Sequence, residues 1–275
     1  MRCYYINLSN RPDRRSNMER RFADLGIIAQ RIEAATENNI TDIQRQLYCN
    51  PASFKWQTER ELSCSISHLR AIKAFLASGA RYAAIFEDDV VFSSGILEFL
   101  EKFEEESADF DLVRIGTHPN TVRLASHPDF IIENYSLHKI YQFCYGAAAY
   151  IVSKKAAQFI LDSNVMLERT TDAALYRPDL LFSRKHRVYQ VIPALAIQEH
   201  CLEGNIAEIS DLFASRESRF RVNSKNTFER LRYYLPDLFR TFLPSLIRVP
   251  WLRLRYGVRR MKVPIHLKSD IQTPT

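Results

Sequence analysis

The sequence predicts an α/β protein in which one Rossmann-type domain is built around a mostly parallel central sheet. Short apolar runs, typical of buried strands, alternate along the chain with longer amphipathic stretches, typical of helices. The 275 residues are 46% hydrophobic, which is enough apolar side chain to fill the core of such a domain. This alternation indicates strands joined by crossover helices and therefore a layered fold.

The first part of the chain predicts two strands, a helix and a loop. Residues 3–8 are predicted to form a strand, and residues 12–25 a helix that has a proline in its first turn and ends at Gly26. Residues 27–34 predict the second strand. Residues 36–57 are polar and irregular, and they indicate a loop with some helix.

The clearest helical pattern begins at Glu59. Apolar side chains recur there at spacings of three and four residues, and Gly79 ends the pattern. This apolar stripe consists of Leu62, Ile66, Leu69, Ile72 and Leu76. Residues 82–86 then predict a buried strand, and residues 94–106 another helix.

The rest of the domain continues the alternation. Strands are predicted at 112–116, 146–152 and 187–192, helices at 154–161 and 172–182, and a hairpin or irregular strands at 121–142. The sequence contains no G-x-G-x-x-G motif and no P-loop, so neither of those phosphate-binding motifs operates here.

Three consecutive carboxylates, Glu87, Asp88 and Asp89, follow the predicted strand at 82–86. Buried carboxylates repel one another and are costly unless a cation or hydrogen-bond donors satisfy them. Ligands bind beyond the carboxyl ends of strands in parallel sheets, so the triplet is predicted to hold a divalent metal and a diphosphate. Strand periodicity places Glu87 and Asp89 on the same face. The alternative is an acidic turn that faces water.

The cysteines and the apolar runs bear on the compartment. The five cysteines are scattered without C-x-x-C pairing, which argues against a disulfide framework or a zinc site and favours a reducing compartment. The N-terminus has too few apolar residues for a signal peptide, and no apolar run approaches the ~18 residues that span a membrane. We therefore expect a cytoplasmic protein that is free or held at a membrane surface.

The C-terminal part differs in composition, which predicts a domain over residues 1–215 and a basic tail over residues 216–275. Residues 216–268 carry fourteen Lys and Arg and three acids, a net charge of +11, among large apolar side chains. Short amphipathic helices of this composition suit an anionic membrane surface. The prolines expected to separate them are Pro236, Pro244 and Pro250. The alternatives are packing on the domain or a homodimer interface. Nucleic-acid binding is not favoured, because no nucleic-acid motif accompanies the charge.

Several segments, taken in order, resemble glycosyltransferase family 25, the lipooligosaccharide-type galactosyl- and glucosyltransferases. They are INLSNRPDRR (6–15), LSCSISHLRAIKAFLASG (62–79), AIFEDDV (84–90), YGAAAYIVSKKAAQFIL (145–161), TTD (170–172) and VIPALAIQ (191–198). Ser63 departs from the family pattern, which has a glycine at that position. The ordered set spans about residues 1–200, and the basic tail lies outside it.

The resemblance implies a GT-A-like fold, a UDP-sugar donor, a divalent metal and transfer with inversion at the anomeric carbon. Hard oxygen ligands suit Mn²⁺ or Mg²⁺, and such a metal stabilises a departing diphosphate as a Lewis acid. Asp89 is expected to bind the metal directly. Glu87 and His200 are further candidates for the metal, and Glu87 and Asp88 are also expected to contact the donor.

Other side chains are candidates for donor binding. Guanidinium groups suit phosphate oxygens, so Arg11 or Arg14 is expected at the diphosphate, with ordinary ion pairs of a solvated helical turn as the alternative. Asn7 is expected to contact the uracil edge or to cap a turn. The other candidates are Ser67, His68 and Gln198. A satisfied core histidine is the alternative interpretation of a histidine on an apolar helix.

An inverting transfer also needs a carboxylate that accepts the proton of the attacking hydroxyl. Asp172, in the matched TTD segment, is the candidate base, with Glu199 and Glu203 as rivals. It could instead clamp sugar hydroxyls, or simply be an acid in the first turn of a helix, where the helix dipole favours negative charge.

The expected function is transfer of a hexose, with galactose favoured, from a UDP-sugar to a sugar hydroxyl of a lipooligosaccharide core. A glycolipid acceptor would place the enzyme on the cytoplasmic face of the bacterial inner membrane. One alternative is a non-catalytic module of the same fold that binds a nucleotide-sugar or a glycan. Another is a metal-dependent nucleotidyltransferase or phosphohydrolase, which normally needs a second acid cluster that is not evident here.

Overall fold

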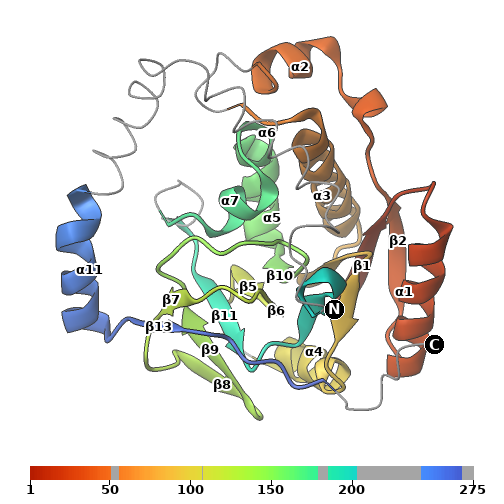
Figure 1. The fold of residues 1–275 in the computed structure, drawn as a ribbon. Helices are drawn as coiled ribbons and strands as arrows, with labels where there is room; N and C mark the ends of the chain where they lie inside the picture. Colours follow the sequence, from red (N-terminus) through yellow and green to blue (C-terminus); the bar gives the residue numbers. More distant parts are fainter. Residues whose placement is uncertain (51–55, 107, 179–184, 203–242, 268–275) are drawn as a thin grey trace.

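The computed structural model describes residues 1–50, 56–106, 108–178, 185–202 and 243–267, and its centre is an eight-stranded sheet (Figure 1). The strands lie in the order β2-β1-β3-β10-β5-β11-β9-β8. Their bounds are β2 Ala29–Glu33, β1 Arg2–Asn7, β3 Tyr82–Glu87, β10 Ala149–Ser153, β5 Leu112–Arg114, β11 Val188–Ile192, β9 Tyr135–Lys139 and β8 Phe130–Ile132.

Most strands of this sheet run in one direction. The pairs β1–β2, β1–β3 and β5–β11 are parallel, whereas β10 lies antiparallel between β3 and β5, and β9 lies antiparallel between β11 and β8. Among the described strands of the sheet, β10 and β9 therefore run opposite to the other six. The predicted α/β class with a mostly parallel central sheet is confirmed.

Helices cover both faces of the sheet. The apolar sides of α3 (Glu59–Ala77), α5 (Lys154–Asp162), α6 (Val165–Glu168) and α7 (Thr171–Tyr176) share one core layer. The apolar sides of α1 (Pro12–Leu25) and α4 (Ile96–Glu105) share the other. Strand β1 contributes to both layers because its side chains alternate, with Tyr4 and Ile6 in the first and Tyr5 in the second.

Local signals set the ends of the two helices nearest the acidic triplet. Helix α1 has Pro12 in its first turn and ends at Gly26, whose φ of 70° lies in the left-handed region that glycine adopts most easily. Helix α3 begins after Thr58, which forms a reciprocal capping box with Glu61. The predicted start of each helix is confirmed.

A second, three-stranded sheet lies beside the end of β3. It consists of β4 (Val90–Phe92), β12 (Ala196–Gln198) and β6 (Gly116–Thr117). Strand β12 pairs antiparallel with β4, so that Gln198 is opposite Val90. The backbone N–H of Glu199 donates a hydrogen bond to the carbonyl oxygen of Asp89, at 2.9 Å. These contacts bring the late segment around residue 198 to the acidic triplet.

Other predicted elements differ in detail. The predicted strand at 112–116 is divided between β5 and β6, which belong to different sheets. The loop with some helix that was predicted at 36–57 is confirmed in its described part, which contains the 3-10 turn η1 (Glu37–Asn39) and the helix α2 (Asp42–Tyr48). The predicted helix at 172–182 ends as α7 at Tyr176, and residues 179–184 lie outside the described part of the chain.

The described part of the predicted tail contains a helix and a strand. Helix α11 (Leu243–Tyr256) has Pro244 in its first turn and continues through Pro250, so the prediction that Pro250 divides the tail into pieces is wrong. A proline removes one backbone donor, and this helix tolerates the loss. Strand β13 (Arg259–Met261) pairs antiparallel with β7 (Val122–Leu124).

Residues after α11 thus pack on the main domain. The side chain of Val263 is buried, and its carbonyl oxygen accepts a hydrogen bond from Thr117 at 3.2 Å. The predicted boundary near residue 215 and Pro236 lie outside the described residues. Among the helices that the structure describes, none is both long and apolar enough to cross a membrane.

Candidate active site

The acidic triplet occupies the turn between β3 and β4, at the carboxyl edge of the parallel strands. Glu87 is the last residue of β3, and Asn7 is the last residue of the neighbouring parallel strand β1. The side chains of Glu87, Asp88 and Asp89 are 24%, 11% and 15% exposed, so the triplet is not an open acidic turn. Negative charge that is withdrawn from water in this way needs nearby donors or cations.

Residues from β1 and α1 donate hydrogen bonds to the carboxylate of Asp88. The amide nitrogen of Asn7 donates to one carboxylate oxygen of Asp88 at 2.7 Å, and Arg14 Nη1 donates to the other at 3.1 Å. Arg14 Nη1 also lies 3.9 Å from Asp89 Oδ2. Arg31, from β2, fixes the amide of Asn7 by donating to its oxygen at 3.0 Å. Asn7 and Arg14 therefore belong to the same polar cluster as the triplet.

Gln198 joins Glu87 to Asp89. Its side-chain nitrogen donates to Glu87 Oε2 at 2.9 Å and lies 3.2 and 3.3 Å from the two carboxylate oxygens of Asp89. Burial and the neighbouring charge of Glu87 raise the pKa of Asp89 to about 7, although Arg14 and Gln198 act in the opposite direction. The protein's own donors therefore do not fully compensate the negative charge of the triplet.

His68 approaches the triplet from α3. Its Nε2 atom lies 3.4 Å from Glu87 Oε1, and its Nδ1 atom is hydrogen-bonded to the hydroxyl of Tyr150 at 3.0 Å. The histidine is only 1% exposed, and its ring also stacks on that of Tyr150. This buried side chain is held by one core residue and faces one member of the triplet, and its predicted contact with the donor remains a prediction.

Two cavities meet at this cluster. The larger, of about 520 Å³, lies over the carboxyl ends of β1, β2 and β3 and is lined by Arg14, His68 and all three acids of the triplet. The smaller, of about 110 Å³, lies on the side of α7 and β12. Cys64, Glu87 and Gln198 line both cavities and so form the wall between them.

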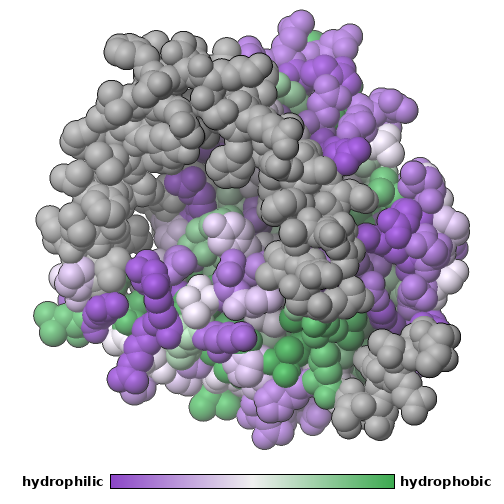
Figure 2. Space-filling model, in the orientation of Figure 1, coloured by the Kyte–Doolittle hydropathy of each residue, from purple (hydrophilic) through white to green (hydrophobic). Residues whose placement is uncertain are grey.

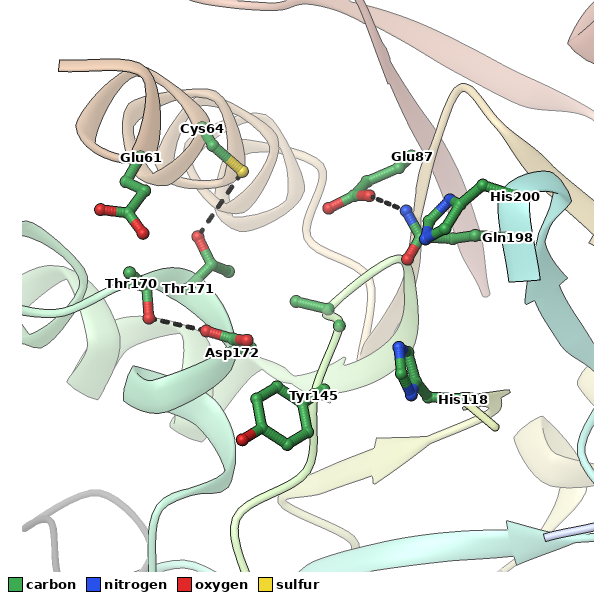
Figure 3. A pocket seen from close by; sticks show the side chains of 12 residues that line it. Glu61, Cys64, Glu87, His118, Tyr145, Thr170, Thr171, Asp172, Gln198 and His200 are labelled. Atoms are coloured by element: carbon green, nitrogen blue, oxygen red, sulfur yellow. Dashed lines mark hydrogen bonds between the residues drawn. The ribbon is translucent and has the colours of Figure 1, made fainter. Parts of the chain in front are cut away.

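Figure 3 shows how the smaller cavity is arranged. Thr170, Thr171 and Asp172 lie on one side of the cavity, and Glu87, Gln198 and His200 on the other. Asp172 is 6% exposed, and its Oδ1 atom accepts hydrogen bonds from Thr170 Oγ1 at 2.6 Å and from the backbone N–H of Ala173 at 2.8 Å. The local helix start thus orients the Asp172 carboxylate, and the fold brings it across a cavity from Glu87.

His200 and Gln198 come from the same late segment. His200 lies in the short 3-10 turn η2 (Glu199–Cys201) and lines the smaller cavity. Burial and the positive charge of Arg14 lower the pKa of His200, while Glu87 acts in the opposite direction. The neutral imidazole, the form that binds metals, is therefore favoured. The rival base Glu199 instead forms an ion pair with Arg21, and Glu203 lies outside the described residues.

Two donor-binding candidates have other contacts. Ser67 lines the larger cavity, but its hydroxyl donates to the carbonyl of Ser63 at 2.7 Å and accepts from the backbone N–H of Ala35 at 2.8 Å. The bond from Ala35 ties α3 to the segment after β2. Arg11 forms an ion pair with Asp13 and is not among the residues that line either cavity. The roles predicted for both residues remain predictions.

Several lining residues were not singled out from the sequence. Tyr145 is 46% exposed and its ring lies 5.9 Å from that of His118, so the two present a partly open aromatic wall to the smaller cavity. Glu61 and Cys64 line the same cavity from α3. Cys64 lies four residues before His68 on the same helix, so the helical spacing from that donor-binding candidate was the signal that could have found it.

The chemistry of these residues fits a hard divalent cation. Three shielded carboxylates lie together at one turn, and burial, with the nearby charge of Glu87, raises the pKa of Asp89, so a cation beside it would offset an unfavourable charge. Carboxylate oxygens are the ligands that Mn²⁺ and Mg²⁺ prefer. Asp89 and Glu87, with His200 close by, are the residues that would hold it.

Comparisons with known proteins agree with the resemblance noted in the sequence. The model of glycosyltransferase family 25 (LPS biosynthesis protein) matches residues 1–175. The lacto-N-neotetraose biosynthesis glycosyltransferase LgtE of Neisseria gonorrhoeae is 30% identical over 251 residues, which cover 84% of this chain and 88% of LgtE. The lipooligosaccharide biosynthesis protein lex-1 of Haemophilus influenzae is 27% identical, with 70% of this chain and 67% of lex-1 covered.

More distant similarities extend to an animal protein and to a solved structure. A probable inactive glycosyltransferase 25 family member 3 of Bos taurus is 26% identical over 58% of this chain and 28% of its own length. The crystal structure of a glycosyltransferase involved in the glycosylation of the major capsid of PBCV-1 superposes with a TM-score of 0.40 at 10% identity, covering 81% of this chain and all of that one. The family match over most of the described domain, together with the 30% identity to LgtE, establishes that the chain belongs to glycosyltransferase family 25.

Proposed function

We propose that this protein is a metal-dependent glycosyltransferase that moves galactose from UDP-galactose to a sugar hydroxyl of a lipooligosaccharide core, with inversion. One observation carries the proposal: the triplet lines a cavity of about 520 Å³, and its Glu87 also lines a smaller, adjoining cavity of about 110 Å³. A transferase needs a donor site and an acceptor site that meet at the reacting atoms. The names of the relatives support the lipooligosaccharide acceptor.

The larger cavity suits the nucleotide part of the donor. It lies at the carboxyl ends of parallel strands, where nucleotides bind in α/β proteins, and Arg14 and Asn10 line it close to Asp88. In this assignment Arg14 offsets negative charge that develops on the diphosphate during transfer. Asn7 holds the edge of the cluster in place by donating to Asp88, and Arg31 holds Asn7 by donating to its amide oxygen.

A bound Mn²⁺ or Mg²⁺ would supply Lewis-acid stabilisation of the departing diphosphate oxygens. Asp89 and Glu87 are the carboxylates that would hold it, with His200 as a third ligand. The side-chain nitrogen of Gln198 donates to both carboxylates and so holds them close together. His68 orients the other oxygen of Glu87 from the opposite side.

The smaller cavity suits the acceptor sugar. The acceptor hydroxyl oxygen attacks the anomeric carbon of galactose as the bond from that carbon to the UDP oxygen breaks, and the hydroxyl proton passes to Asp172. Attack from the face opposite the leaving group inverts the configuration. Asp172 faces Glu87 across this cavity, and Tyr145 offers an aromatic surface on which a sugar ring can lie (Figure 3).

We propose further that α11 attaches the enzyme to an anionic membrane surface. Leu254 and Trp251 are 90% and 50% exposed on this helix, and the neighbouring Arg253 and Arg255 are exposed as well. Exposed apolar side chains beside arginine suit the interface of an anionic bilayer. Figure 2 shows hydrophobic surface next to hydrophilic surface at the left edge, where α11 lies in Figure 1.

A donor screen tests the catalytic proposal. Purified protein is incubated with Mn²⁺, a lipooligosaccharide-core oligosaccharide and each of a panel of UDP-sugars, and UDP is measured. We expect acceptor-dependent UDP release with UDP-galactose, and its loss in Asp89→Asn. The release should be retained in the control Asp109→Asn, whose side chain is 86% exposed and forms an ion pair with Arg81. Proton NMR of the product gives the anomeric configuration.

The same assay separates the alternatives. Nucleotide binding without UDP release from any sugar would favour a non-catalytic binding module, a form that one relative's name makes relevant. Pyrophosphate in place of UDP would indicate a nucleotidyltransferase, and free phosphate a phosphohydrolase. UDP release from a UDP-sugar with a different hexose would support the transferase activity but show that galactose is not the transferred sugar.

A further inference from the structure

A second group of metal-binding atoms lies on the wall between the two cavities. Cys64 and His68 are four residues apart on α3 and therefore project from the same side of the helix, toward the end of β3 where Glu87 lies. One ligand atom from each of Cys64, His68 and Glu87 falls within 4.8 Å of the other two. Cys64 and Glu87 line both cavities, so an ion can reach these atoms from solvent.

His68 is held in a fixed orientation for such a role. Its Nδ1 atom is hydrogen-bonded to the buried hydroxyl of Tyr150 at 3.0 Å, which leaves Nε2 directed at Glu87 Oε1, 3.4 Å away. A histidine that binds a metal through one ring nitrogen typically has the other held by an oxygen partner, which fixes its tautomer and its direction. Tyr150 is that partner here.

Glu87 has a different neighbour on each oxygen. Its Oε1 atom faces His68, whereas its Oε2 atom accepts the hydrogen bond from Gln198, which also contacts Asp89. One carboxylate therefore belongs to two groups of ligands. The group with Asp89 contains hard oxygens, and the group with Cys64 and His68 contains sulfur, nitrogen and oxygen.

These two ligand sets prefer different cations. Thiolate and imidazole select zinc-like ions over Mn²⁺ and Mg²⁺, which favour carboxylates. We propose that Cys64, His68 and Glu87 form a separate site for Zn²⁺ or a similar thiophilic cation, and that its occupation weakens Mn²⁺ binding at Asp89. The sequence argued against a zinc site because it contains no paired cysteines, but this set is assembled from a helix and a strand end.

The weakening of Mn²⁺ follows from the shared carboxylate. A cation beside Oε1 draws the negative charge of Glu87 toward Cys64 and His68, and it repels a second cation on the other side of the same carboxylate. Zn²⁺ would then act as an inhibitor that competes for Glu87 without occupying the position of Mn²⁺.

Co²⁺ titration of the metal-free, full-length protein tests the site, because thiolate bound to Co²⁺ gives an ultraviolet charge-transfer band. We expect the band in the wild-type protein and in the control Cys49→Ser, since burial raises the pKa of Cys49 to about 11 and disfavours its thiolate. We expect its loss in Cys64→Ser. Tyr150→Phe should keep the band but weaken Zn²⁺ binding about 10-fold, the usual effect of removing such a partner.

A band of unchanged intensity in Cys64→Ser, or equal Zn²⁺ affinity of Cys64→Ser and wild-type protein by calorimetry, would overturn the site. Electron paramagnetic resonance of free Mn²⁺ tests the coupling: one equivalent of Zn²⁺ should release Mn²⁺ from the wild-type protein but not from Cys64→Ser. Equal release from both would contradict the sharing of Glu87. The Co²⁺ band should persist in Asp89→Asn, so failure of the Mn²⁺ site and failure of this site give different results.

Discussion

The side-chain amide of Gln198 donates a hydrogen bond to Glu87, 111 positions earlier in the chain, at 2.9 Å. The same nitrogen lies within 3.3 Å of both oxygens of Asp89, so one neutral donor spans two carboxylates that would otherwise repel each other. The pairing of β12 with β4 makes this contact possible. The late segment VIPALAIQ (191–198) is thereby connected physically to the acidic triplet.

Replacement of Gln198 should therefore change how the triplet titrates. The hydrogen bond from Gln198 lowers the pKa of Asp89, so Gln198→Ala should raise that pKa further and shift the pH at half-maximal Mn²⁺ binding upward. Mn²⁺ titrations at several pH values measure this shift. The matched control is Gln158→Ala. It removes an exposed amide on α5 that donates a hydrogen bond to Asp162, at the end of the same helix. An unchanged midpoint in Gln198→Ala would show that the amide does not stabilise the charged form.

Asp89→Asn should abolish Mn²⁺-dependent turnover and leave the fold intact. Asparagine keeps the shape of the side chain but removes the charge that would hold the cation. Circular dichroism tests the fold, and Mn²⁺ binding and UDP release test the site, with Asp109→Asn as the charge-matched control. A wild-type rate of turnover in Asp89→Asn would show that Asp89 does not hold the metal.

Metal binding should weaken below about pH 7. Burial and Glu87 raise the pKa of Asp89 to about 7, and a proton on this carboxyl competes with the cation. If one proton is displaced, the apparent Mn²⁺ affinity should fall about 10-fold for each pH unit below 7. Calorimetric Mn²⁺ titrations in a non-coordinating buffer, at pH values from about 5.5 to about 8, measure how the affinity changes with pH on either side of that pKa. A flat profile would show that no such proton is displaced.

The same shift predicts how the stability of the metal-free protein changes with pH. The pKa of Asp89 is higher in the folded state than the ~3.9 of an unfolded aspartate, so between these values the folded state binds more protons. The contribution of this group therefore favours folding at low pH and declines as the pH rises from about 4 through 7. Thermal unfolding of wild type and Asp89→Asn should diverge over this window, with the variant relatively more stable at pH 8. Parallel curves for the two proteins would contradict this prediction.

Asp172→Asn should impair transfer without impairing donor binding. A general base typically contributes ~10²–10⁴-fold to the rate, and the asparagine cannot accept the acceptor proton. We expect kcat to fall by about this factor while UDP and Mn²⁺ bind as in the wild type. Asp162→Asn, an exposed change at the end of α5, is the control. A normal kcat in Asp172→Asn would assign the base to another residue.

Leu254→Ser should reduce binding to anionic vesicles. Burial of a leucine side chain is worth ~1.5–3 kcal/mol, which corresponds to about a tenfold or greater loss of partitioning. Co-sedimentation with vesicles of phosphatidylglycerol and of phosphatidylcholine measures the effect and its dependence on lipid charge. The control is Ile28→Ser, because Ile28 is 93% exposed between α1 and β2. Equal losses of vesicle binding in both variants, or no loss in either, would show that α11 does not attach the protein to the membrane.

Local sequence signals determined much of the secondary structure. The apolar stripe and the capping residues predicted α3, and Pro12 and Gly26 predicted both ends of α1. The acids after the strand at 82–86 indicated a site because their unusual charge density is local and visible in one short segment. Periodicity, capping and charge each act over a few residues, so a single sequence reports them directly.

Only the tertiary structure decided which distant residues meet. Strand β10 (AYIVS) is mostly apolar, which indicates burial but not its antiparallel place between β3 and β5. The position of Asp172 across a cavity from Glu87, and the donation of one amide from Gln198 to two carboxylates, depend on strand order and helix packing. Such contacts arise from the packing of elements far apart in the chain, and no local pattern encodes that packing.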